Sequence, residues 1–185
     1  MNSSESKNAV DLNEAKEQVR KVCKRLALLH LSYAKVIIDE LGEVEGKNLV
    51  LKAIKDYGIR IGENVKETVH AKGSNNDPEN YTEDLPSYGM HDKMEKVNLN
   101  NEEYIRAYGC VMGKYWKELG ENEIGRYYCY VDPAKYMAFN PDFKLIHTKT
   151  IPDGDEYCEF KIKHTTEQER DDFFKKDKDW SYIDK

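Results

Sequence analysis

The chain has 185 residues, of which 39% are hydrophobic and 35% charged, with a net charge of −6 and a mean hydropathy of −0.85. A chain of this length can bury a core, so we expect one domain over residues 11–185 after a polar, disordered segment at 1–10. Acidic and basic residues are interleaved and form no basic stripe, which argues against a nucleic-acid partner.

The termini and the cysteine pattern point to a cytoplasmic protein that needs no cofactor. The stretch 1–18 lacks the apolar core of a signal peptide, and no run approaches the ~18 apolar residues of a membrane span. The four cysteines are then expected to be reduced thiols. Neither Cys-x-x-Cys nor His-x-x-x-His occurs in the sequence, so no standard zinc framework is present.

Two long helices are predicted in the N-terminal part. Asp11 and Glu14 have the spacing of a capping box. Apolar residues then recur with a helical period over 15–41, and again over 50–69 after a glycine-bearing turn. We expect the two segments to form an antiparallel helical hairpin.

Gly58 and Gly62 lie four residues apart inside the second predicted helix. Each costs about 1 kcal/mol relative to alanine in a helix interior. Two interpretations stay open: close approach of another backbone or a ligand, or a weakly helical stretch that tertiary packing tolerates.

The middle of the chain is predicted to be a long loop followed by a third helix. Residues 74–100 are rich in Asn, Asp, Pro and Gly, and a loop of this length is typical of a lid or a mobile segment. Asn101 then suits a helix N-cap, and apolar residues continue with a helical period to Leu119. Cys110 would lie in the middle of this helix.

In the C-terminal part the hydrophobic period changes from that of a helix to that of a strand. The predicted elements are strands at 127–131, 143–150 and 158–163, a short helical turn at 133–139, and a charged helix that begins at Thr166 with a capping box to Glu169. The tail after this helix docks by Trp180 or is loose. The whole pattern predicts an α+β fold, in which a helical hairpin and a further helix pack on a small antiparallel sheet.

Cys129 and Asp132 are the residues that point most directly to chemistry. They flank the end of a predicted strand, where an aspartate could orient water and a thiolate could act as a nucleophile. The other interpretation is structural, because free cysteines are often buried and Asp-Pro is a common turn. The residue types alone favour the structural interpretation.

Two further cysteines and an aspartate accompany this pair. Cys158 faces the same side of its predicted strand as Phe160, toward the core or a cavity, and Asp155 could simply cap the turn before it. Cys110, Cys129 and Cys158 could together hold a metal ion as a three-thiolate site, although no paired ligand motif supports this.

The segment 110–160 resembles the L-2-amino-thiazoline-4-carboxylic acid hydrolase family. The resemblance lies in five short motifs in register, which are Cys110-Val111, Trp116-Lys117-Glu118-Leu119-Gly120, Tyr128-Cys129-x-x-Asp132, Phe139-Asn140-Pro141 and Gly154-Asp155-x-x-Cys158-x-Phe160. Val111 stands where the family pattern has proline. The N-terminal half matches loosely, around Gly58 and Gly62.

The resemblance implies a hydrolase that opens a small cyclic amidine, with Cys129 and Asp132 as the central pair and Cys158 and Asp155 as the opposing wall. A cation should hold the substrate carboxylate. The candidate substrate-binding residues are Arg60, His70, Arg106, Arg126, Asn140 and His147. The alternative is a small-molecule sensor or carrier without turnover, related to 4-vinyl-reductase-like ligand-binding domains. The long first helix and the thirteen tyrosines favour a homodimer.

Overall fold

The computed structural model describes residues 10–82, 84–176 and 178–185, so the predicted disorder at 1–9 falls outside the described residues. The helices are α1 (Leu12–Leu41), α2 (Glu43–Ala71), α3 (Val111–Glu118), α4 (Asn122–Cys129), α5 (Val131–Phe139) and α6 (Glu167–Phe174). The strands are β1 (Lys93–Leu99), β2 (Glu102–Tyr108), β3 (Phe143–Lys149) and β4 (Tyr157–His164). Single 3-10 turns lie at Pro78–Asn80 and Ser181–Ile183. The predicted α+β class is confirmed.

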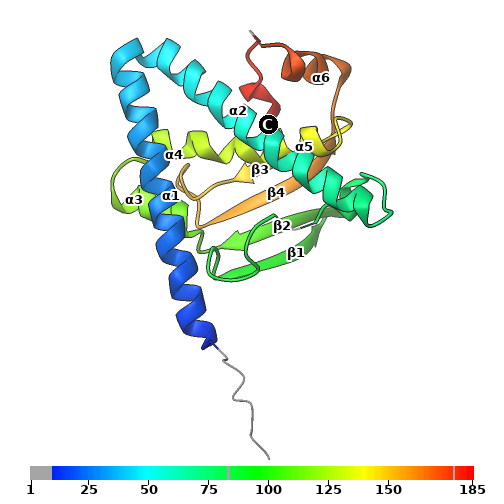
Figure 1. The fold of residues 1–185 in the computed structure, drawn as a ribbon, viewed down its shortest axis with the longest axis horizontal. Helices are drawn as coiled ribbons and strands as arrows, with labels where there is room; N and C mark the ends of the chain where they lie inside the picture. Colours follow the sequence, from blue (N-terminus) through cyan, green and yellow to red (C-terminus); the bar gives the residue numbers. More distant parts are fainter. Residues whose placement is uncertain (1–9, 83, 177) are drawn as a thin grey trace, which may run out of the picture.

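The four strands form one antiparallel sheet in the order β1-β2-β4-β3. Figure 1 shows the helices α1, α2, α4 and α5 gathered on one side of this sheet, with α1 along one edge of the molecule. The predicted helical hairpin is confirmed, since α1 and α2 are joined at Gly42, which has a positive φ of 81°. Asp11 caps α1 as expected, because its carboxylate accepts hydrogen bonds from the N–H groups of Asn13 and Glu14.

Two predicted elements of the middle region are wrong. The predicted helix from Asn101 is instead β2 followed by α3, and the predicted loop at 74–100 contains β1. Asn100 and Asn101 both have positive φ, 53° and 64°, and make the tight turn of a β1–β2 hairpin. Asparagine tolerates the left-handed region that such two-residue turns require.

The predicted strand at 127–131 is also wrong, because this segment is the junction of two helices. Cys129 is the last residue of α4, and Asp132 lies in the first turn of α5. A proline at the third position of α5 is compatible with the helix, since N–H groups of the first turn have no intrahelical partner. The strands predicted at 143–150 and 158–163 are confirmed as β3 and β4.

The glycines of α2 allow α5 to approach its backbone. A Cβ on Gly58 would lie 2.5 Å from the Ala134 Cβ, and a Cβ on Gly62 would overlap the carbonyl oxygen of Lys135. Of the two interpretations of these glycines, close approach of another backbone is therefore confirmed. The contact holds α5, which carries Asp132, firmly between α2 and the sheet.

Replacing Gly62 with alanine is expected to destabilise the fold by about 2–3 kcal/mol. Alanine ordinarily stabilises a helix relative to glycine, but here its methyl group would collide with Lys135 and Ala138. Urea unfolding measures the change. Glu63→Ala, at an exposed neighbouring position, is the control and should stay within about 0.5 kcal/mol. A Gly62→Ala protein as stable as the parent would contradict the close approach.

The C-terminal tail folds back onto the helices. Trp180 and Ile183 are buried with Ala134, Met137 and Phe173, so docking by Trp180 is the one of the two predicted alternatives that the structure has. The Thr166–Glu169 capping box of α6 is confirmed as well. Within the described residues, no helix is long and apolar enough to cross a membrane.

Candidate functional site

Cys110 is placed by the transition from β2 to α3. It is the N-cap residue of α3, not a mid-helix residue as predicted. Gly109 before it has a φ of 68°, and a side chain at this position would collide with the Asp92 carboxylate. That carboxylate bonds to Arg20 of α1 at 3.2 Å and to Lys114 of α3 at 3.0 Å, which fixes both helices against the turn.

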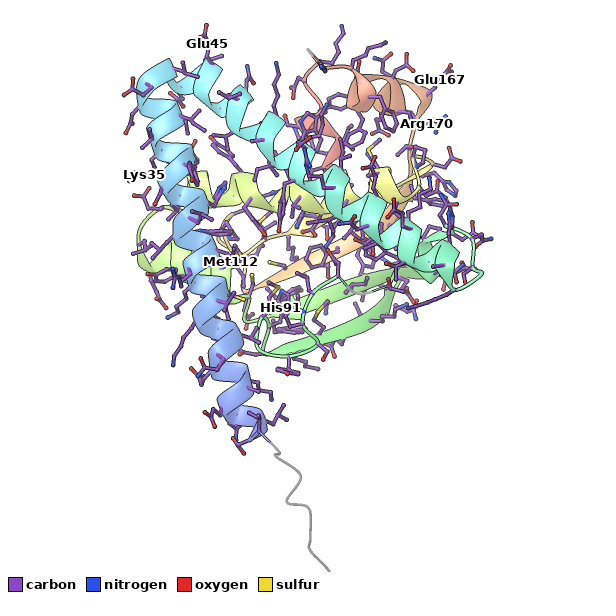
Figure 2. All side chains as sticks on the ribbon, in the orientation of Figure 1. Lys35, Glu45, His91, Met112, Glu167 and Arg170 are labelled. Carbon is purple, nitrogen blue, oxygen red and sulfur yellow. The ribbon has the colours of Figure 1, made fainter. Side chains whose placement is uncertain are left out.

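His91 lies beside Cys110 because the β1–β2 pairing continues past the end of the ladder. The Asp92 N–H donates to the Tyr108 carbonyl at 2.9 Å, and the Val111 N–H donates to the Met90 carbonyl at 3.0 Å. This register sets His91 opposite Cys110. Figure 2 labels His91 below Met112, and Met112 is buried against α1 with Cys23 and Ala27.

The surroundings of Cys110 favour its thiolate. A hydrogen bond from Cys158 lowers the pKa of Cys110 well below its usual value, despite the opposing effect of burial. His91 and the backbone N–H of Gly113 lower the pKa of Cys110 further. The half-buried sulfur also lies at the positive end of α3, a position that stabilises thiolates. The proton is held instead by the buried Cys158, whose pKa is raised first by this same hydrogen bond.

Cys129 has the opposite character. Burial raises its pKa well above that of an ordinary thiol, although the nearby Arg126 guanidinium works in the other direction. It packs into the hydrophobic cluster of Cys23, Met112 and Trp116. Cys129 is therefore a neutral thiol, and its position between Cys110 and the charged groups of α5 makes it part of the lining of the site.

A buried array of alternating charges begins at Asp132. Its carboxylate lies 3.0 Å from Lys135 Nζ and 3.3 Å from His147 Nε2. On the other side of the imidazole, His147 Nδ1 lies 3.0 Å from a carboxylate oxygen of Asp184. Arg126 Nη2 donates to Asp184 at 2.7 Å, and Lys135 also pairs with Asp84 at 3.3 Å.

These neighbours decide the protonation states. Burial opposes a charge on Asp132, but Lys135 and His147 outweigh it and hold the pKa of Asp132 far below its usual range. Burial alone would lower the pKa of His147, yet its hydrogen bonds to Asp132 and Asp184 raise that pKa to about 9. At neutral pH the array therefore contains an imidazolium between two aspartates, which can donate a proton to a leaving group.

Arg126 connects the charged array to the thiols. Its guanidinium bonds to Asp153 at 3.0 Å and to Asp184, and lies over the ring of Tyr130. The remaining nitrogen, Nη1, is buried and has no hydrogen-bond partner among the described residues. An unpaired donor of this kind is costly, and an anionic ligand would satisfy it.

Phe160 lies between the thiols, the histidine and a surface hollow. On β4 it packs with Cys110 against the cluster that contains Cys158, and its ring centre is 4.8 Å from that of His147. The same side chain lines a hollow together with Glu102, Glu103, Ile105, Lys161 and Ile162. Among the described residues that line this hollow, only Phe160 also contacts the candidate site.

The structure brings together only some of the residues that the sequence suggested. Cys129, Asp132, Cys158, Arg126 and His147 lie in the interior described above. Asp155 accepts a hydrogen bond from the Thr150 N–H at 2.9 Å and caps its turn, as the structural interpretation anticipated. Asn140 caps α5 and donates to the Asn76 carbonyl at 3.0 Å.

Three predicted substrate-binding residues lie elsewhere. Arg60 is exposed on α2 and pairs with Asp56 at 2.8 Å. His70 is exposed at the end of α2, and Arg106 projects from β2 to pair with Glu159 at 2.7 Å. The residues that the sequence did not suggest for catalysis are His91, Lys135 and Asp184, and for Cys110 it suggested only a metal-ligand role.

The three-thiolate metal site is not assembled. Within the part of the chain that the structure describes, no group of three or more His, Cys, Asp or Glu side chains could hold a metal ion. Cys110 interacts with Cys158 near the sheet, whereas Cys129 packs into the cluster under α1.

Fold and site together define an α+β protein with a cysteine–histidine pair at a helix N-terminus, next to a buried array of carboxylates and cations. The chain belongs to the L-2-amino-thiazoline-4-carboxylic acid hydrolase family, whose model matches residues 20–162. No curated protein and no solved structure matches the chain. Asp184 and the C-terminal tail lie beyond the matched segment.

Proposed function

We propose that the protein hydrolyses a small cyclic amidine that carries a carboxylate, such as 2-aminothiazoline-4-carboxylate, and that Cys110 is the nucleophile. The observation that carries the proposal is the position of Cys110, at the N-terminus of α3 with His91 and Cys158 beside it. Activated cysteines in enzymes commonly combine a helix N-terminus with a neighbouring histidine. The family name supports the same class of reaction.

The reaction balances in two steps. The Cys110 thiolate adds to C2 of the ring, the bond from C2 to the ring sulfur breaks, and this sulfur leaves as a thiol with the proton of His147. Water then adds to the same carbon. One water proton goes to the substrate nitrogen and the other restores the His147 imidazolium, while the bond to Cys110 breaks and regenerates its thiolate. The product is an N-carbamoyl-cysteine.

Arg126 is the side chain that we expect to hold the substrate carboxylate. Its Nη1 is a buried donor without a partner among the described residues, and its guanidinium is close enough to Cys129 to lower the pKa of that thiol. A guanidinium suits a carboxylate because its donors lie in one plane. Asp132 and Asp184 keep His147 charged and oriented, which makes them positioning residues.

The purified chain incubated with 2-aminothiazoline-4-carboxylate tests the proposal by mass spectrometry of the products. We expect N-carbamoyl-cysteine to accumulate and, on rapid acid quench, a substrate adduct on the peptide that contains Cys110. Turnover without any adduct would show that water attacks the ring carbon directly and that Cys110 is not the nucleophile. Saturable binding without turnover would instead support the alternative function of a small-molecule sensor or carrier.

A further inference from the structure

Helix α1 has two apolar faces, and only one of them is covered. Cys23, Ala27, Leu31 and Ala34 are buried against α2, α3 and α4. A second stripe lies on the outside of the same helix, where side chains remain 38–67% exposed. This outer stripe consists of Val22, Leu26, Leu29, Tyr33 and Val36.

The outer stripe has the spacing of a coiled coil. Its members are separated by four, three, four and three residues, which is the a/d pattern of a heptad repeat. The same spacing continues upstream through Ala15 to Leu12, which is 54% exposed, but Val19 between them is partly buried and packs against the domain's own cluster of Cys23 and Met112. An amphipathic surface helix ordinarily needs one apolar stripe for its own core. The additional seam keeps the a/d spacing over about two heptads, from Val22 to Val36, and this is the pattern of a helix that pairs with another helix.

The position of α1 leaves this seam accessible. Figure 1 shows α1 at one edge of the molecule, with its first turns projecting past α3 and beyond the sheet. Figure 2 shows side chains extending from the outer side of this helix with no other element beside them.

We infer that the outer stripe of α1 binds the same stripe of a second copy of this chain, in a parallel helical pair. The sequence next to the seam fits this occupant. With Leu12 at an a position, Asp11 is a g residue and Lys16 is the following e residue. In a parallel pair, Asp11 of one copy faces Lys16 of the other, and the two-fold axis makes this contact twice.

The way in which α1 packs on its own domain also fits a parallel pair. The e positions Cys23, His30 and Ile37 face the body of the protein, where His30 bonds to the Ile124 carbonyl at 2.9 Å. In a parallel pair, each e position lies opposite a g position of the partner helix. Because each domain is attached on the e side of its own helix, the two domains then lie on opposite sides of the helical pair. An antiparallel pair would instead face e with e and bring both domains to the same side.

Light scattering on the full chain, coupled to size exclusion, tests this inference. We expect a mass twice the 21.6 kDa of one chain at micromolar concentration. Leu29→Glu places charges at the centre of the seam in both copies and should raise the dimer dissociation constant at least about 30-fold. Leu28→Glu is the matched control, since Leu28 is 42% exposed on the same helix but outside the seam.

Three outcomes would overturn the inference. The first is a parent chain that remains monomeric at about 100 μM. If that monomer also sediments with anionic lipid vesicles, the stripe binds a membrane surface rather than a second copy. The second is a dimer that both substitutions leave intact, and the third is a dimer that both disrupt equally. Circular dichroism shows whether each variant keeps its helices, and the expected Leu29→Glu protein is a folded monomer. Tyr33→Cys, in a protein whose four native cysteines are changed to serine, should form a disulfide between two copies on oxidation only if the helices are parallel.

Discussion

Replacing Cys110 with alanine is expected to lower kcat/KM for ring opening by at least about 1,000-fold, while Cys129→Ala changes it by less than about tenfold. Removing a nucleophile from an enzyme removes the whole covalent route, which typically costs several orders of magnitude. Cys129 has no such role in the proposed mechanism, because burial raises its pKa and keeps the thiol neutral. Steady-state kinetics on both folded variants measures the difference.

Alkylation gives a readout of the same cysteine that does not depend on the substrate. Iodoacetamide should modify Cys110 first, with a pH midpoint below the ordinary thiol pKa of about 8.5. His91→Asn should shift this midpoint upward, because it removes one of the groups that favour the thiolate. If the Cys129→Ala protein is inactive and the Cys110→Ala protein is active, then Cys129 and not Cys110 is the nucleophile.

The chemistry of Cys110 was hidden in the sequence by one misassigned turn. Asn100 and Asn101 look like a polar segment that leads into a helix cap, and the helical period of the residues after them supports that error. Recognised as a hairpin turn, the pair fixes the register in which Lys93 is opposite Tyr108 and His91 is opposite Cys110. The signal was therefore present, but asparagine suits both a helix cap and a left-handed turn.

Other parts of the fold could be predicted because several local signals agreed. The α1–α2 hairpin has a capping aspartate, sustained periodicity and a glycine turn. Gly58 and Gly62 left two interpretations open, of which close approach is the one observed, where α5 crosses α2. Residues 127–131 have alternating apolar residues over too few positions to distinguish a strand from a helix junction. The family motifs do not depend on secondary structure, so they single out Cys129 and Asp132 even though the predicted strand is absent.

The charged array could not be predicted from sequence, because its members are far apart along the chain. Asp132 and Lys135 are on α5, His147 is on β3, and Asp184 comes from the tail. Asp132 and Lys135 have the i,i+3 spacing of a helical pair, but no spacing rule connects them to His147 or Asp184. Asp184 also lies outside the segment that the family model matches, so the family motifs give no indication of it.

Asp184→Asn is expected to destabilise the protein by about 3–5 kcal/mol, the range found when one partner of a buried ion pair is removed. The side chain of Asp184 is fully buried and accepts hydrogen bonds from the His147 N–H at 2.8 Å and from Arg126 at 2.7 Å. Asparagine keeps the shape of the side chain but leaves both cations with less compensation. Urea unfolding measures the loss, with Asp171→Asn, exposed on α6, as the control.

The pH dependence of stability distinguishes lost charge compensation from a simple packing defect. In the parent protein the pKa of His147 is raised to about 9, above the value of about 6.5 for an unfolded histidine. The contribution of His147 to the free energy of unfolding is therefore complete below about pH 6.5 and is lost as the pH rises through about 9. Asp184→Asn removes one of the two carboxylates that raise this pKa, so the loss should be smaller and complete at a lower pH, and the NMR titration midpoint of His147 should fall. A variant that is destabilised equally at every pH, with the His147 midpoint unchanged, would show that Asp184 acts only by filling space. His147 would then no longer be assigned as a proton donor held between two aspartates.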